Sequence, residues 1–538
     1  MFYRGYSILT SLARPEALPS PRAPGALKAW AEEGAQRAMR RALPDMALSE
    51  RLSDLTAYRR LQRARRQTLE ALMLIEPDEA ALRRALDVAC MLCEESTWSE
   101  NPSGAPFDDD SHPEIDVQCA ETAVLLGWFA RACGDLLSSR VANKLTCEVR
   151  RRVFSPFLAH QDYPFMRARG KRPLLILSDI LLSAMLLETD AQRRAMVMKQ
   201  ALRLIDQGIQ TRPERIETLC DAAAETGAIT DLAALLRRMT RGELDLTPTY
   251  PTPEWLDQLL YPWLEGEYFA DPAAGDMLPP LSGETLFRIG LAGNDDALTA
   301  LGAKLHRARR IPSDSVTGRL MDMAFQPMLE AESRKMPRIR SGATPLNRVM
   351  VSRFGSMTCA MHTGGHRANA GGLMLFSDGR PVLVESGGFC SVPCIGGRDQ
   401  LETPDLRCEA EYDLRQDMDT MSVELTTAWP AGLINAYQRT AMVRRQDGAL
   451  QLVEALDLAE PAGVTFRFIT PRRPEYLMDG LRLGGVDMRW DGKFSVRAEP
   501  LNRRFPDGDA EGDALYRIEL ATPGPIQRAL YTFTFSRQ

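Results

Sequence analysis

Two histidines close to a glycine pair are the first candidates for proton transfer. His362 and His366 flank Gly364 and Gly365, and glycine leaves the backbone free to bring an imidazole to a surface. Histidine is the natural base near neutral pH, whereas most histidines at strand ends simply satisfy hydrogen bonds within the fold. The pattern allows a catalytic base and favours structural histidines.

Cysteines and aspartates offer two possible metal sites. Cys390, Cys394 and Cys408 could hold zinc with a fourth ligand from elsewhere, but their first spacing is C-x3-C without a glycine-rich knuckle, so free thiols are favoured. The run Asp108–Asp110 lacks the alternating ligands and closing glutamate of a calcium loop. A solvated turn or a helix cap is the better interpretation of that run.

A basic turn at 167–173 supplies the cations that an acidic ligand would need. Within it, Lys171 and Arg172 could bind a carboxylate, and arginine does so in bidentate geometry. The alternative is a solvated loop before a helix, which is the more common role of such turns. Tyr163, just before this turn, is the one tyrosine we nominate as an acid/base, although its neighbours Pro164 and Phe165 favour simple packing.

Composition limits the class of protein. The 538 residues are 44% hydrophobic and 26% charged with a net charge of -6, which predicts a soluble protein of about two domains. The negative charge gives no global attraction for nucleic acid, so an acidic ligand would need a locally basic groove. No window is apolar enough to cross a membrane and no secretion signal is evident, so we expect a cytoplasmic protein whose scattered cysteines stay reduced.

The spacing of apolar residues changes from a helical to a strand-like pattern near residue 335. From about 26 to 332 apolar residues recur at helical spacing, with turn-rich breaks that separate short paired helices. After about 345 short β-type runs follow, punctuated by Asp-Gly pairs such as Asp378-Gly379 that suit tight hairpins. The sequence predicts a multidomain α+β protein, with helical hairpins over 1–335 and an antiparallel β-sandwich or roll over 336–538.

Three groups of segments carry a family resemblance. They are CEESTW (93–98) followed by IDVQCAETAVLL (115–126), then GLMLFSDGRPVLVESGG (372–388), and finally LTTAWP (425–430) with YQRTAMV (437–443). In order and spacing they resemble the heparinase II/III-like polysaccharide lyases. The resemblance implies an incomplete α/α toroid followed by an antiparallel β-sandwich.

Lyases of this kind cut uronate-containing glycans by β-elimination. A donor neutralises the carboxylate, a tyrosine or histidine removes the neighbouring proton, and another donates to the leaving oxygen. The resemblance places the family's asparagine pair at Gly170-Lys171-Arg172, its catalytic tyrosine near Thr226, and its histidine-rich run at 365–369. Much of the family's catalytic set is therefore substituted.

The same resemblance predicts which residues stand at the positions of the family's zinc ligands. Its ligand positions fall on Arg367, Glu385 and Cys390, and arginine stays protonated and cannot bind a metal. We expect an Arg367–Glu385 ion pair in place of the metal and no cofactor, with zinc possible but not favoured.

Two functions remain open at this stage. In the first, a rebuilt lyase acts on an acidic oligosaccharide, with His366 as base, Arg172 or Arg367 as carboxylate clamp and Tyr163 as an auxiliary acid/base. In the second, a non-catalytic relative binds such a glycan or serves as a scaffold, as a homo-oligomer or beside an active paralogue, without nucleic acid or membrane. The residues expected to contact sugar are Lys171, Arg172, His362 and Asn369.

Overall fold

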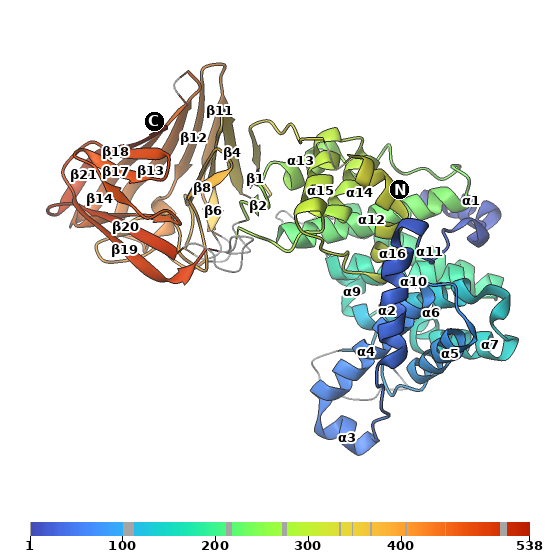
Figure 1. The fold of residues 1–538 in the computed structure, drawn as a ribbon. Helices are drawn as coiled ribbons and strands as arrows, with labels where there is room; N and C mark the ends of the chain where they lie inside the picture. Colours follow the sequence, from blue (N-terminus) through green and yellow to red (C-terminus); the bar gives the residue numbers. More distant parts are fainter. Residues whose placement is uncertain are drawn as a thin grey trace. The chain divides into compact units, whose positions relative to one another are not determined.

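The computed structural model describes residues 2–100, 112–168, 171–210, 218–271, 277–332, 335–346, 348–365, 368–403, 406–446, 448–505 and 514–537, with Lys171 and Gly365 described by backbone alone. It forms two units (Figure 1). One unit comprises Met1–Pro213, Asp221–Thr252 and Ser282–Lys335, and the other comprises Pro253–Leu281 and Met336–Gln538 with a short segment ending at Cys220.

The first unit is helical. Its helices are α1 (Tyr6–Leu12), α2 (Lys28–Arg40), α3 (Leu48–Ser53), α4 (Leu55–Met73), α5 (Glu79–Cys93), α6 (Val117–Cys133), α7 (Ser139–Val149), α8 (Ser155–Ala159), α9 (Pro164–Arg167), α10 (Lys171–Leu187), α11 (Ala191–Gln210), α12 (Leu219–Met239), α14 (Gly283–Gly293), α15 (Asp296–Ala308) and α16 (Val316–Glu332). Asp54, Asp78 and Asp116 cap α4, α5 and α6 by accepting a backbone N–H at 2.7–2.8 Å.

Two of these helices are apolar around most of their circumference. Helix α6 carries alanine, leucine and aromatic residues, α10 is rich in leucine and isoleucine, and the two helices pack against each other. A helix with no polar face must be enclosed by others. Asp179, in the middle of α10, is buried by this packing.

Glycines set the close approach of α14 and α15. A Cβ at Gly290 would lie 2.5 Å from the backbone nitrogen of Thr299, and one at Gly302 would lie 2.3 Å from that of Phe287. Neither position has room for a side chain, so the two helices form a tight antiparallel hairpin of the kind the sequence predicted.

The second unit is built from antiparallel strands. They are β1 (Trp263–Glu265), β2 (Tyr268–Phe269), β3 (Gly342–Thr344), β4 (Val349–Phe354), β5 (Met357–His362), β6 (Gly364–Gly365), β7 (Leu373–Ser377), β8 (Arg380–Leu383), β9 (Cys394–Ile395), β10 (Leu406–Arg407), β11 (Ala410–Leu414), β12 (Met418–Glu424), β13 (Ile434–Arg444), β14 (Ala449–Ala462), β15 (Val464–Thr470), β16 (Glu475–Tyr476), β17 (Gly480–Leu483), β18 (Val486–Trp490), β19 (Ser495–Arg504), β20 (Ala514–Ala521) and β21 (Ile526–Arg537). One helix, α13 (Pro253–Leu260), precedes them.

Three sheets dominate this unit. An eight-stranded sheet runs β11-β12-β13-β14-β21-β18-β17-β16, a five-stranded sheet runs β3-β4-β5-β7-β8, and a four-stranded sheet runs β19-β20-β15-β9. The Asp378-Gly379 turn between β7 and β8 has positive φ at both residues, 51° and 73°, as a tight hairpin requires. The alternating burial of β14 gives the sheet one core face.

The predicted fold class is confirmed: an incomplete α/α toroid is followed by an antiparallel β-sandwich. The segment 253–281, which the sequence assigned to the helical half, groups with the strands instead, because Leu264, Tyr268 and Met277 pack into a core shared with β4, β5 and β7. Among the described residues, no helix is long and apolar enough to cross a membrane.

Candidate functional site

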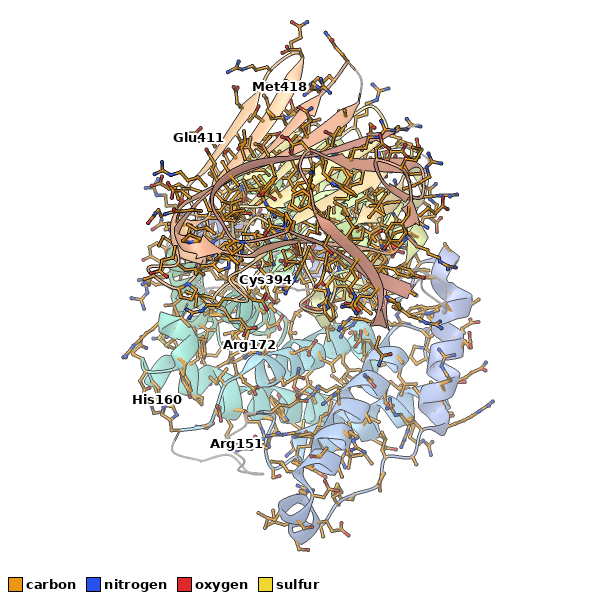
Figure 2. The ribbon with its side chains drawn as sticks, turned by 90° about the vertical axis from the view of Figure 1, so that its left-hand side faces the viewer. Arg151, His160, Arg172, Cys394, Glu411 and Met418 are labelled. Carbon is orange, nitrogen blue, oxygen red and sulfur yellow. The ribbon has the colours of Figure 1, made fainter. Side chains whose placement is uncertain are left out.

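Several of the sequence-predicted site residues fall outside the described part of the chain. His366 and Arg367 lie outside it, as does the run Asp108–Asp110, and Lys171 is described by backbone alone. Their proposed roles stay predictions. Arg172, in the first turn of α10, is exposed to solvent and therefore accessible to a ligand (Figure 2).

Tyr163 is a packing residue in this structure. Its side chain is 2% exposed, its ring stacks on Phe165 at 5.5 Å, and its hydroxyl donates a 2.7 Å hydrogen bond to the backbone oxygen of Pro113. A hydroxyl that is buried and committed to a carbonyl cannot approach a sugar without a rearrangement. The nomination of Tyr163 as an acid/base is therefore not supported by its geometry.

His362 does not reach a surface in this structure, in line with the favoured interpretation as a structural histidine and not with its nomination as a sugar contact. As the last residue of β5 it lies inside the five-stranded sheet, fully buried, and its Nε2 lies 2.9 Å from Oε2 of Glu385. Asn369 is also buried, with its amide nitrogen 3.5 Å from the same carboxylate oxygen. Both residues, which we expected to contact sugar, are enclosed; all six residues of β5, His362 included, are buried.

Glu385 therefore has a partner other than the predicted one. Arg367, the partner that we predicted, lies outside the described residues, and the pairing stays a prediction; the contact of Glu385 with His362 is direct. Gly372 makes room for this contact, since a Cβ there would lie 2.0 Å from Oε1 of Glu385. A buried histidine–glutamate pair occupies the region where the resemblance located a metal site.

Cys390, Cys394 and Cys408 are not among the groups of described residues whose ligand atoms lie close enough together to hold a metal ion. Cys390 donates a weak hydrogen bond to the backbone oxygen of Ala368 at 3.4 Å. Burial raises the pKa of the Cys390 thiol well above its usual range and that of Cys408 to about 11, and it also raises the pKa of Cys394. At neutral pH and without a metal these groups are protonated thiols, which are poor nucleophiles.

The motif that best carries the resemblance has a structural role. Trp98 is fully buried, and its indole N–H donates to the backbone oxygen of Leu92 at 2.7 Å. Glu95 is buried beside Arg65 at 3.3 Å and Gln62 at 3.1 Å. Burial raises the pKa of Glu95 to about 7 despite these donors.

Thr226, the position aligned with the family's tyrosine, takes no part in proton transfer. It is fully buried in α12, and its hydroxyl donates to the backbone oxygen of Ala222 at 2.7 Å. The alignment of this position with the family's tyrosine stays a prediction.

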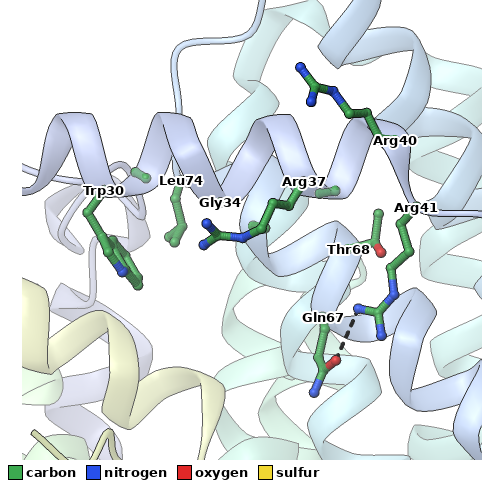
Figure 3. Close-up of a pocket in the computed structure, with 11 residues that line it drawn as sticks. Trp30, Gly34, Arg37, Arg40, Arg41, Gln67, Thr68 and Leu74 are labelled. Carbon is green, nitrogen blue, oxygen red and sulfur yellow. Dashed lines mark hydrogen bonds between the residues drawn. The ribbon is translucent and has the colours of Figure 1, made fainter.

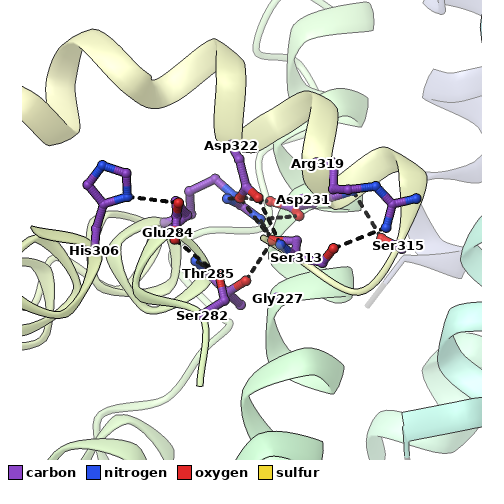
Figure 4. Close-up of polar contacts among 12 residues, drawn as sticks. Gly227, Asp231, Ser282, Glu284, Thr285, His306, Ser313, Ser315, Arg319 and Asp322 are labelled. Carbon is purple, nitrogen blue, oxygen red and sulfur yellow. Dashed lines mark hydrogen bonds and ion pairs between the residues drawn. The ribbon is translucent and has the colours of Figure 1, made fainter. Parts of the chain in front are cut away.

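A buried ionic network joins three helices of the toroid (Figure 4). Arg288 of α14 contacts Asp231 of α12 with two nitrogens at 2.7 and 2.9 Å, and it also pairs with Asp322 of α16. Ser313 completes the network by donating to Asp322 from its hydroxyl at 2.8 Å and from its backbone N–H at 3.0 Å. The network is closed to solvent, so it serves to hold helices and not to bind a ligand.

A basic groove lies on the surface of the helical unit, lined by residues of α2 and α4 (Figure 3). It has a volume of about 600 Å³, and none of its lining residues is acidic. Arg37, Arg40 and Arg41 are all exposed along it, and Trp30 is 47% exposed at its side. The lining residues are Trp30, Ala31, Gly34, Arg37, Ala38, Arg40, Arg41, Gln67, Thr68, Ala71 and Leu74.

The arginines of this groove differ in how far they are already engaged. Arg37 pairs with Glu33 at 2.5 Å, and Arg41 donates to the side-chain oxygen of Gln67 at 3.1 Å. Arg40 makes no ion pair with a described residue. The spacing Arg37, Arg40, Arg41 places the three on neighbouring positions of the last turn of α2 and just beyond, which the sequence analysis did not single out.

A cluster of His112, His160 and Asp162 was also missed by sequence reasoning. The Nε2 of His112 lies 3.1 Å from Oδ1 of Asp162, and the two imidazole rings are 4.3 Å apart between centroids. Their separation by 48 positions along the chain gave no local signal, since only the tertiary fold brings the two loops together.

Comparison with solved structures identifies the fold. A heparinase III structure has a TM-score of 0.56 at 10% identity, covering 93% of this chain and 79% of that one. Chondroitin AC lyase of Streptomyces coelicolor A3, in complex with chondroitin sulphate, has a TM-score of 0.57 at 12% identity, covering 100% and 82%. A Paenibacillus xanthan lyase has a TM-score of 0.60 at 9% identity, covering 95% of this chain and 56% of that one.

These neighbours give this chain a polysaccharide lyase-like fold, as the resemblance predicted. At such low identity the likeness concerns the fold alone. The sequence itself matches no family model and no curated protein.

Proposed function

We propose that this protein binds an acidic oligosaccharide on its helical unit and does not cleave it. The observation that carries the proposal is the groove along α2, where exposed arginines and a tryptophan line a concave surface without acidic residues. A protein with a net charge of -6 needs such a local concentration of cations to attract an anion. The fold supports the choice of ligand, because a structural neighbour is in complex with chondroitin sulphate.

The groove has the two kinds of contact that an acidic sugar requires. Guanidinium groups bind carboxylates and sulfates in bidentate geometry, and Arg40 is the arginine of this set least engaged within the described chain. The indole of Trp30 is 47% exposed, and the guanidinium of Arg310 lies over its ring at 5.7 Å. Its exposed part is the apolar surface against which the C–H side of a pyranose ring can pack.

Elimination would need an accessible acid/base pair in addition to a carboxylate clamp. Tyr163 and His362, two of the described residues that we nominated for such chemistry or for sugar contact, are buried and hydrogen-bonded. Removing several groups that act together leaves little transition-state stabilisation. Binding without cleavage is thus the function that the described residues support best, and the expected cytoplasmic setting and any oligomer or paralogue partner remain part of the proposal.

The test combines binding and catalysis with the same purified protein. We expect heparan sulfate, chondroitin sulfate or another uronate-containing oligosaccharide to bind in calorimetry, with an affinity that falls as salt rises because exposed charges are screened. Trp30→Ala and Arg40→Ala should each weaken binding about tenfold, which corresponds to about 1.4 kcal/mol. An ultraviolet assay for the unsaturated uronate product should stay silent.

The matched control is Arg83→Ala, which removes an exposed arginine of α5 that pairs only with Glu79. It should leave binding unchanged. Product formation that disappears in His366→Ala would overturn the proposal in favour of a working lyase, and equal binding by the wild type and the groove variants would remove the groove as the site.

A further inference from the structure

We propose that His112, His160 and Asp162 form a binding site for a divalent transition-metal ion of the zinc type. The nitrogen and oxygen atoms that these side chains offer as ligands all lie within 4.8 Å of one another. Two imidazoles and one carboxylate are ligands that zinc takes at about 2.0–2.2 Å, so a small inward rotation of each side chain would close them on one ion. All three residues belong to the helical unit, and none of them lines the α2 groove.

The three ligands come from two loops that are fixed to each other. His160 follows the last residue of α8, where its backbone N–H bonds to Pro156 at 2.9 Å, and Asp162 lies two residues further on. His112 comes from the other loop, immediately before Pro113. The hydroxyl of Tyr163 donates to the Pro113 oxygen and thereby ties the two loops together beside the ligands.

Aromatic contacts orient the rings further. The ring of Tyr163 lies 4.8 Å from that of His112 and meets the ring of His160 edge-on at 6.1 Å. Tyr163 therefore positions both imidazoles, which explains why a tyrosine next to a basic turn is buried and not free for catalysis. Such supporting contacts fix ligand orientation in metal sites and strengthen binding.

The exposure of the three side chains and their combined charge both suit an ion that keeps open coordination positions. The side chains of His112 and Asp162 are 38% and 65% exposed, so an ion could enter and retain water ligands. Two neutral imidazoles and one carboxylate leave a divalent ion with a net charge of about +1, which would favour an anionic oxygen at the open position. Calcium and magnesium prefer oxygen ligands throughout and should bind poorly.

The experiment measures metal binding directly, without any glycan. Metal-free protein is titrated with zinc in calorimetry, and about one ion per chain is expected. His112→Ala, His160→Ala and Asp162→Asn should each weaken the affinity at least about tenfold, the size of effect seen even for supporting residues. Tyr163→Phe, which keeps the ring and loses the hydroxyl, should weaken it by a smaller factor because only the positioning is lost.

Two control variants separate this site from nonspecific binding. His306→Gln removes an imidazole that contacts the carboxylate of Glu284 at 2.7 Å but belongs to no possible metal-binding group among the described residues. Asp135→Asn removes an exposed carboxylate of the same unit. Both should bind zinc as the wild type does, and far-ultraviolet circular dichroism should show that every variant is folded.

Cobalt substitution distinguishes these ligands from the ten free cysteines. A cobalt complex of nitrogen and oxygen ligands has visible bands without the intense sulfur charge-transfer absorption in the near ultraviolet. That spectrum, lost in the His160→Ala variant, is the expected result. A charge-transfer band that persists in all three ligand variants, or zinc affinity equal in wild type and variants, would overturn the proposal, whether or not the protein binds a glycan.

Discussion

At the scale of single residues, Asp179 is a carboxyl group whose ionised form is disfavoured by burial. It lies buried in the apolar helix α10, where burial and the nearby Glu121 raise its pKa well above the usual range while Arg319 opposes the shift. The folded chain therefore holds this proton more tightly than the unfolded chain. The associated stability is present at pH below the unfolded pKa and is lost as the pH rises towards the folded pKa.

Asp179→Asn should remove this dependence. The variant lacks the ionisable group, and each tenfold difference in proton affinity is worth about 1.4 kcal/mol, so we expect its melting temperature at pH 8 to exceed that of the wild type by about 2–4 °C. The difference should shrink towards pH 4. Scanning calorimetry over this pH range makes the comparison.

Asp206→Asn is the matched control for this substitution. Asp206 is also a buried aspartate of the helical unit, but it accepts backbone N–H groups of Phe2 at 2.6 Å and Tyr3 at 2.9 Å. An amide cannot replace both acceptors, so this variant should melt lower. A lower melting temperature for Asp179→Asn at pH 8 would contradict the interpretation of Asp179.

At the scale of elements, the network around Arg288 ties α12, α14 and α16 together (Figure 4). Arg288→Met would leave Asp231 and Asp322 buried side by side without their cation. Breaking a buried pair in this way costs about 3–5 kcal/mol. We expect a large fall in the melting temperature.

The loss of stability in the Arg288→Met variant should be smaller at low pH than at high pH. Burial already raises the pKa of Asp231, and removing the cation would raise it further. The penalty should therefore be smaller at pH 5, where the aspartates take up protons more readily, than at pH 8. Arg237→Met, which breaks a more exposed pair with Asp245 at 3.3 Å, should change the melting temperature little at either pH.

At the scale of the whole molecule, the two units are interleaved in sequence. Tyr268, from the segment 253–281, packs against Phe376 at 5.4 Å and against Phe505 at 5.3 Å, and Leu264 and Met277 join the same core. Each such side chain contributes about 1.5–3 kcal/mol through burial. A fragment of residues 336–538 alone would expose this surface.

We therefore expect the 336–538 fragment to bind hydrophobic dyes and to melt lower than the same fragment purified together with the 253–281 peptide. A peptide with Tyr268→Ala should restore less stability than the wild-type peptide. Equal melting temperatures with and without the peptide would show that the strands are complete by themselves. Thermal melts followed by circular dichroism and dye fluorescence provide the comparison.

How far the sequence determined these findings depends on the range of the interaction. Helical and strand periodicity are local, so the order of elements and the Asp378-Gly379 hairpin could be predicted. The site could not, because burial of His362 depends on which strands flank β5, and the meeting of His112 with His160 depends on tertiary packing. The arginine groove was foreseen only as a requirement of the net charge, not as a location.

The interleaving also has a consequence during protein synthesis. The ribosome releases the 253–281 segment before the strands that cover it, and the last partner in that core, Leu515, follows roughly 250 residues later. At a synthesis rate of about 5–20 residues per second, this apolar segment stays without its partner strands in the nascent chain for some tens of seconds. Meanwhile the helices of 282–335 emerge and complete the first unit. The helical unit can therefore fold while the 253–281 segment, which interrupts it in sequence, still lacks its partner strands.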